Sequence, residues 1–170
     1  MPRRDVCFRP GEYYHVYNRG VNRETIFFAR NNYVFFLRKV RQFLLGEPSS
    51  PAAAEQQPGY LAGASNGAAT RSVSVLADCL MPNHYHCLVQ VHTTDFSARM
   101  QSLIQGYVNA VNRQQRRTGP LFQSRFKVHW VEQEDYLLHL TRYIHLNPVT
   151  AGLVAGPEDG EFSSCQDYVG

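Results

Sequence analysis

The alternation of apolar and polar positions predicts four β-strands in this chain. The first covers residues 13–19, which are aromatic and β-branched and precede a glycine. A second strand begins at Val73, and a tight turn at Pro82-Asn83 leads into a third strand, the return arm of a hairpin. A fourth strand is predicted over about residues 125–132, where apolar and basic side chains alternate.

Apolar residues that recur at three- and four-residue steps predict three amphipathic helices. The first begins at an N-cap of Asn31 or Asn32 and ends before Gly46. The second lies between the third and fourth strands. The last begins at Glu134, whose charge suits a helix N-terminus, and is predicted to end at Pro148.

The order of these elements, β-α-β-β-α-β and then a helix, predicts an α+β fold with a ferredoxin-like antiparallel sheet. In that topology the first and third strands lie side by side in the middle, and two helices cover one face. The extra C-terminal helix is free to cover the opposite face. We expect one domain over residues 1–170, with a flexible low-complexity insertion at about 47–71, where Ala, Gly, Ser, Pro and Gln dominate.

The third strand carries two histidines that share one face. Side chains alternate across a strand, so His84 and His86 point to one side and Tyr85 to the other. Two imidazoles on one face can hold a divalent metal ion if a third ligand comes from elsewhere. On the last helix Tyr143 and Asn147 lie one turn apart, and the topology lets that helix bring them to the histidines. Without that convergence, a surface histidine pair and a core tyrosine are the plainer interpretations.

Basic residues cluster along the chain although the net charge is only +3. Residues 96–131 contain no acidic side chain, and the first 45 residues are also rich in arginine. Clustered positive charge attracts phosphate backbones, and the alternative is a solvated cationic surface. The basic residues of the acid-free segment are Arg99, Arg113, Arg116, Arg117, Arg125 and Lys127.

Other features of the composition exclude whole classes of protein. Apolar residues make up 44% of the chain, which is a globular composition, and no run approaches the ~20 apolar residues of a membrane span. The residues after Met1 lead into no apolar signal core, so we expect a cytoplasmic protein with no membrane partner. The four cysteines are scattered without a Cys-x-x-Cys pair, which indicates reduced thiols.

Four separated motifs together resemble those of the REP-associated tyrosine transposases. These proteins belong to the wider single-tyrosine, His-hydrophobic-His transposases. In chain order the motifs are Tyr14-His15-Val16 with Asn18-Arg19-Gly20 and Arg23, then Met81-Pro82-Asn83-His84-Tyr85-His86, then Gly119-Pro120-Leu121-Phe122-Gln123-Ser124-Arg125-Phe126-Lys127, then Arg142-Tyr143-Ile144-His145-Leu146-Asn147-Pro148-Val149.

The resemblance implies an enzyme that nicks and transfers single-stranded hairpin DNA with Mg²⁺ or Mn²⁺. By position, His84 and His86 match the metal histidines and Asn147 matches the third, polar ligand. Tyr143 matches the nucleophile that forms a 5′-phosphotyrosine link. The resemblance also implies a nucleoid-associated monomer or homodimer. The residues expected to contact the DNA are Asn18, Arg19, Arg23, Arg113, Arg116, Arg117, Arg125 and Lys127.

Two other functions remain open from the sequence. A ferredoxin-like sheet with a basic surface could bind nucleic acid by its structure without cutting it. A zinc hydrolase could use the same histidines, but the sequence offers it no convincing third histidine or carboxylate ligand.

Overall fold

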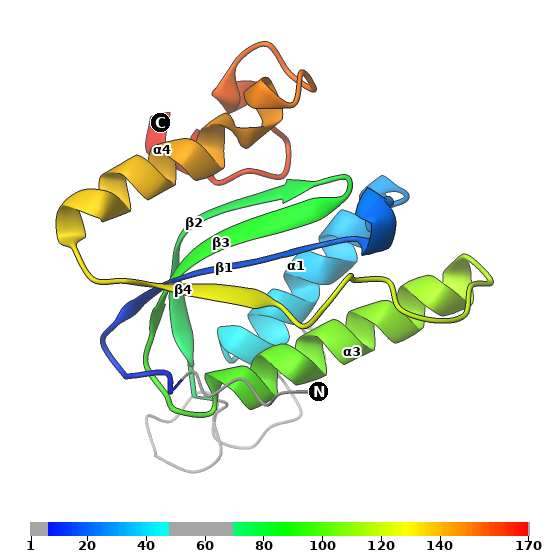
Figure 1. Cartoon of the computed structure of the whole chain (residues 1–170), viewed down its shortest axis with the longest axis horizontal. Helices are drawn as coiled ribbons and strands as arrows, with labels where there is room; N and C mark the ends of the chain where they lie inside the picture. Colours follow the sequence, from blue (N-terminus) through cyan, green and yellow to red (C-terminus); the bar gives the residue numbers. More distant parts are fainter. Residues whose placement is uncertain (1–6, 48–69, 170) are drawn as a thin grey trace.

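A four-stranded antiparallel sheet forms the centre of the molecule (Figure 1). The computed structural model describes residues 7–47 and 70–169, so most of the predicted insertion lies outside the described residues. The sheet order is β2-β3-β1-β4, with β1 and β3 in the middle, which confirms the predicted topology. The strands are β1 (Tyr13–Arg19), β2 (Val73–Met81), β3 (His84–Val91) and β4 (Lys127–Val131).

Two helices cover one face of the sheet, α1 (Arg30–Leu44) and α3 (Phe96–Gln114) (Figure 1). Tyr85 and Val89 of β3 point to this side and are buried against Phe36 of α1 and Tyr107 of α3. The apolar side of β3 therefore faces the two helices, and the histidines face away from them. No helix within the described ranges is long and apolar enough to cross a bilayer.

The C-terminal helix α4 (Glu134–Thr150) lies across the opposite face of the sheet, as predicted (Figure 1). Its buried residues Leu140 and Ile144 form a second apolar cluster with Leu88 of β3 and Val131 of β4. Burying side chains of this size stabilises a contact by about 1.5–3 kcal/mol each. The cluster therefore holds α4 against its own sheet at a definite position.

Two predicted helix ends were wrong. Helix α1 begins at Arg30 after an Ala29 N-cap, and Asn32 instead accepts the Phe28 and Ala29 amide protons at 3.0 and 2.9 Å. Helix α4 continues past Pro148 to Thr150. A proline this close to a helix end removes a single backbone hydrogen bond, so the last turn can still form.

The fourth strand is shorter than predicted, and Arg125 lies before its start. A segment after α4 then returns to the edge strand β2, through the turn η2 (Pro157–Asp159) and the short helix α5 (Cys165–Val169). The hydroxyl of Ser164 accepts the Asp78 amide proton at 2.8 Å and lies 3.0 Å from Nε2 of His145. Since His145 belongs to α4 and Asp78 to β2, Ser164 ties the helix to the sheet edge.

We expect Ser164→Ala to loosen α4 without altering any residue of the sheet's open face. The substitution leaves the partly buried Asp78 amide without its side-chain acceptor, so the expected loss lies toward the lower end of the about 1–3 kcal/mol that a fully buried unsatisfied donor costs. Chemical denaturation would measure this loss, and hydrogen exchange should rise in α4 more than in α1. Ser102→Ala, which removes an exposed hydroxyl that donates to the Ala98 carbonyl of the same helix, is the matched control. Equal stability of the two variants would contradict the role of Ser164.

Candidate active site

A cleft of about 320 Å³ lies between α4 and the open face of the sheet. It contains the four residues that the sequence singled out for metal binding and nucleophilic attack, together with polar residues from β1, β4 and the loop before β4. Its lining is His15, Tyr17, Asn18, Arg19, His84, His86, Gln123, Lys127, His129, Tyr143 and Asn147. The predicted convergence of helix and strand on one place is therefore present in the fold.

The two histidines of β3 stand side by side in this cleft. Their ring centroids are 5.2 Å apart and the rings are nearly perpendicular, at 87°. Nδ1 of His84 lies 2.6 Å from Oδ1 of Asn83, and Nδ1 of His86 lies 2.9 Å from Nε2 of His15. The Nδ1 atom of each ring is thus engaged by a neighbour in the protein.

Burial keeps these imidazoles neutral at physiological pH. Desolvation is the main cause that lowers the pKa of His86 to about 3, with smaller contributions from His15, His84 and Arg19. Desolvation, followed by the charge of His129, lowers the pKa of His15 to about 4. The pKa of His84 is also lowered, by burial and then by Arg19, against a hydrogen bond to Asn147. A neutral imidazole retains the lone pair that a metal ion requires.

Tyr143 and Asn147 reach the histidines from α4. The Tyr143 ring meets the His86 ring edge to face, with centroids 5.6 Å apart, and 53% of the tyrosine remains exposed. Nδ2 of Asn147 donates to the Tyr143 carbonyl at 2.8 Å, and the same amide hydrogen-bonds the His84 ring. The phenol is therefore accessible to a large substrate while its position relative to the histidines is defined.

The donor set suits a hard divalent cation. Two imidazole nitrogens and one amide oxygen would form a mixed nitrogen and oxygen site that leaves positions for phosphate oxygens and water, which Mg²⁺ and Mn²⁺ accept. Among residues 7–47 and 70–169, no group of three or more His, Cys, Asp or Glu side chains is arranged to hold a metal ion.

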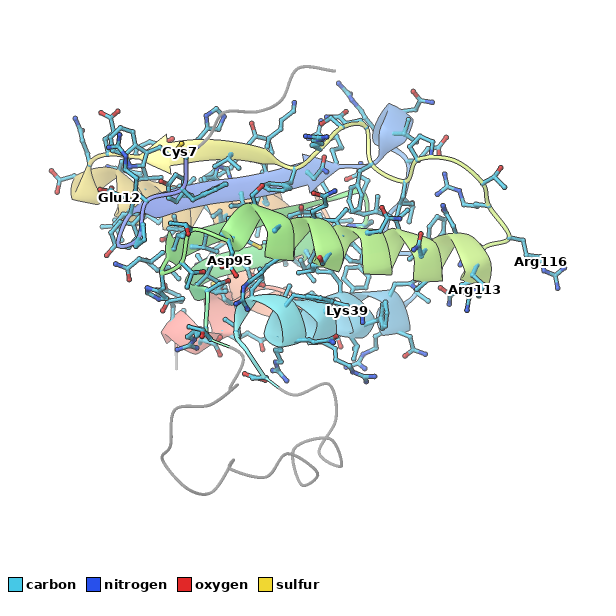
Figure 2. All side chains as sticks on the ribbon, turned by 90° about the horizontal axis from the view of Figure 1, so that it is seen from below. Cys7, Glu12, Lys39, Asp95, Arg113 and Arg116 are labelled. Atoms are coloured by element: carbon cyan, nitrogen blue, oxygen red, sulfur yellow. The ribbon has the colours of Figure 1, made fainter. Side chains whose placement is uncertain are left out.

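The predicted basic residues fall into two groups. Arg19 and Lys127 line the cleft, and Arg125 is exposed just before β4. Arg113 and Arg116 project from the far end of α3 (Figure 2). The second group extends from this helix end to the turn η1 (Val21–Arg23) and consists of Arg23, Arg113, Arg116 and Arg117.

Arg117 connects the helix end to that turn. Its Nη2 lies 3.4 Å from Oε2 of Glu24, and its guanidinium lies over the Phe28 ring at 5.8 Å from the centroid. Arg23 therefore shares one end of the molecule with the arginines of α3. These arginines lie outside the cleft lining, so they extend the basic surface beyond the tyrosine and the histidines.

Asn18 does not have the free side chain that DNA contact requires. It is 1% exposed, its Nδ2 donates to the Ser124 carbonyl at 3.0 Å, and its Oδ1 accepts the Arg19 amide proton at 2.9 Å. Both polar groups are used within the protein, because Asn18 lies on the helix-facing side of β1 together with Tyr14 and Val16 and opposite Tyr85 of β3. We therefore assign Asn18 to holding Arg19 and the loop before β4, and not to binding DNA.

The sequence interpretation missed four residues of the cleft, which are Gln123 in the loop before β4 and His15, Tyr17 and His129 on the strands. The Tyr17 hydroxyl lies 2.9 Å from Nε2 of His129, and the Tyr17 and His15 rings stack with centroids 4.9 Å apart. The signal was available, since His15 and Tyr17 share one side of β1, which pairs with β3. Tyr17 lies directly opposite His86 in that strand pairing. The strand order therefore places His15 and Tyr17 beside the two histidines of β3.

Comparisons with known proteins agree with this fold. A protein of Haemophilus influenzae assigned as a REP-associated tyrosine transposase is 29% identical over 100 residues, which cover 52% of this chain and 57% of the relative. The matched region thus spans little more than half the length of that relative. A solved structure of a REP-associated tyrosine transposase bound to a REP hairpin matches 99% of this chain and 86% of its own, with a TM-score of 0.70 and 19% identity.

The family relationship rests on the sequence of the central segment. Residues 57–147, more than half of the chain, match the family described as Transposase IS200 like. The matched range includes both histidines of β3, the basic segment and Tyr143, and it ends at Asn147. The chain therefore belongs to the IS200-like transposase family.

Proposed function

We propose that this protein nicks single-stranded hairpin DNA and transfers the strand through a 5′-phosphotyrosine bond at Tyr143. The observation that carries the proposal is the placement of an accessible phenol beside two neutral imidazoles, with ring centroids 5.6 Å apart for Tyr143 and His86. A protein that only binds nucleic acid gains nothing from this arrangement. The relatives named above also support a hairpin of the REP kind as the substrate.

The proposed reaction is an exchange of ester bonds at phosphorus. The bond between the Tyr143 oxygen and phosphorus forms as the bond from phosphorus to the 3′ oxygen breaks. The phenol loses one proton and the departing 3′ oxygen gains one, so the step needs no other reactant. Tyr143 acts here as a covalent nucleophile, and the 3′-hydroxyl it frees can later attack the phosphotyrosine and rejoin DNA.

His84, His86 and Asn147 are the residues that would hold a Mg²⁺ or Mn²⁺ ion. Such an ion supplies charge stabilisation on the phosphate and orients its oxygens. The protein contributes the neutral state of both imidazoles and, through the Asn147 bond to the Tyr143 carbonyl at 2.8 Å, a fixed relation between amide and phenol. Arg19 and Lys127, on the same cleft, would pair with the flanking phosphates.

We further propose that Tyr143 serves the site of its own chain. Helix α4 packs on its own sheet through Leu140 and Ile144, and Ser164 ties it to β2. These contacts bring the phenol to the cleft without a second copy of the protein. Mixing a Tyr143→Phe chain with a His84→Ala chain would test this, because catalysis within one chain predicts that the mixture stays inactive.

The proposed function predicts a covalent protein–DNA adduct. A 5′-labelled and a 3′-labelled REP-like hairpin oligonucleotide would each be incubated with the protein and Mg²⁺ or Mn²⁺, then denatured. The label on the 3′ side of the cut should migrate with the protein, and the label on the 5′ side should appear as a shorter free strand. Structure-specific binding with no adduct under any divalent ion would instead favour the binding-module alternative.

A further inference from the structure

We infer that Asn83 and His15 are positioning residues that hold His84 and His86 with the proton on Nδ1, so that each Nε2 presents its lone pair to a cation. The metal-binding part of this inference rests on the proposed function. For His84 the tautomer follows from the hydrogen bonds of Asn83, whereas the His15–His86 hydrogen bond places one proton between two nitrogens and the inference assigns that proton to His86. A neutral imidazole carries one proton on one of two nitrogens, so the partner of one nitrogen decides what the other can bind.

The hydrogen bonds of Asn83 define the proton position on His84. Nδ2 of Asn83 donates to the Arg23 carbonyl at 3.1 Å, and this bond orients the amide so that Oδ1 faces His84. An amide oxygen only accepts, so the His84 Nδ1 atom at 2.6 Å must be the donor. The Nε2 atom of the neutral ring then has no proton, so the Asn147 side chain that also hydrogen-bonds this ring must donate to it, and a cation would take the place of that donor.

His15 contacts Nδ1 of His86 in the way that Asn83 contacts Nδ1 of His84. Nε2 of His15 lies 2.9 Å from Nδ1 of His86, and the two side chains are buried at 8% and 7% exposure. One proton lies between these two nitrogens. When it belongs to His86, the Nε2 atom of His86 is free to bind a cation; when it belongs to His15, that Nε2 atom carries a proton and cannot.

The backbone also makes Asn83 and His15 suitable as rigid partners. The Asn83 carbonyl accepts the Gly20 amide proton at 2.9 Å, which anchors the turn before β3 to the end of β1. His15 lies in the middle of β1, a central strand that is paired on both sides. Both partners thus belong to well-connected backbone, while the histidines they orient face the cleft.

The first test measures the tautomers directly, without metal or DNA. Long-range ¹H–¹⁵N NMR of the full-length protein distinguishes a protonated Nδ1 from a protonated Nε2 for each assigned ring. We expect Nδ1–H on His84 and on His86. An Nε2–H tautomer at either residue would overturn the inference, whatever the protein does to DNA.

The second test links the tautomers to cation binding. His15→Leu removes the nitrogen that accepts from His86 and puts an apolar side chain of related size in its place. Asn83→Ala removes the amide oxygen that accepts from His84. We expect each to move its histidine to the Nε2–H tautomer and to weaken Mn²⁺ binding to the DNA-free protein, measured by electron paramagnetic resonance, by about 10- to 100-fold. His15→Gln, whose side-chain oxygen can accept the same proton, should restore much of the affinity.

The control is His92→Leu, which removes an exposed imidazole whose Nε2 lies 2.9 Å from the Ser74 hydroxyl and which is not part of the cleft lining. It should bind Mn²⁺ as the wild type does. Wild-type affinity in folded His15→Leu and Asn83→Ala would overturn the inference. A wild-type chain that binds no Mn²⁺ would overturn the metal site as well, whereas normal Mn²⁺ binding without a DNA adduct would overturn only the proposed strand transfer.

Discussion

Tyr143→Phe is expected to abolish the covalent adduct with hairpin DNA while hairpin binding and thermal stability stay at wild-type levels. The substitution removes one oxygen atom and keeps the ring that packs edge to face on His86. Because 53% of Tyr143 is exposed, little packing energy depends on its hydroxyl. Loss of the only group that forms the bond to phosphorus should lower nicking by at least about 10³-fold.

Tyr136→Phe is the matched control for this experiment. Tyr136 lies on the same helix and is 55% exposed, but it is not part of the cleft lining. Nicking would be followed by gel electrophoresis of labelled hairpins, and binding by fluorescence anisotropy. An adduct that survives Tyr143→Phe, or that disappears in Tyr136→Phe, would contradict the assignment of the nucleophile.

His84→Ala and His86→Ala are expected to eliminate metal-dependent nicking and to reduce Mn²⁺ binding below detection. Each removes an imidazole that the proposed site cannot replace, since Asn147 would then be left with one histidine partner. A metal ion on a transferring phosphate contributes several kcal/mol of charge stabilisation, so nicking should fall by about 10³-fold or more. Chelation of divalent ions by EDTA should reduce the wild type to the same level.

The control here is His139→Ala, which removes an exposed histidine one turn before Tyr143 on α4. It should nick hairpins and bind Mn²⁺ as the wild type does. Since His86 is 7% exposed, its variant also needs a stability measurement, and His84, which is less buried, provides the cleaner comparison. Full nicking by either β3 variant in the presence of EDTA would refute metal dependence.

Local sequence patterns were sufficient for the elements that lie at the centre of the fold. Period-two alternation gave the limits of β1 correctly, and the hairpin turn at Pro82-Asn83 gave the start of β3. The ends of α1 and α4 were harder. Asn32 caps from inside the helix, and Pro148 is tolerated because the last turn of α4 continues around it. Neither effect can be read from the pattern of apolar residues.

The candidate site shows the same division between local and long-range information. His84 and His86 were identifiable because a strand places alternate residues on one face, and Tyr143 and Asn147 because a helix stacks residues four apart. His15 was not identified, because its role depends on a single contact across two paired strands. Asn18 was assigned to DNA binding, but it is buried on the helix-facing side of β1, and the protein uses both of its polar groups.

The sequence by itself determined which residues share a strand face or a helix face, since these relations follow from the backbone geometry of three or four neighbouring residues. Only the tertiary structure decided that the ring centroids of Tyr143 and His86 are 5.6 Å apart, because that distance depends on how Leu140 and Ile144 pack α4 against the sheet. It also decided the partners of the two Nδ1 atoms, Asn83 and His15. Hydrogen bonds of this kind form between atoms that the folded chain brings together, and their geometry is not encoded in any local stretch.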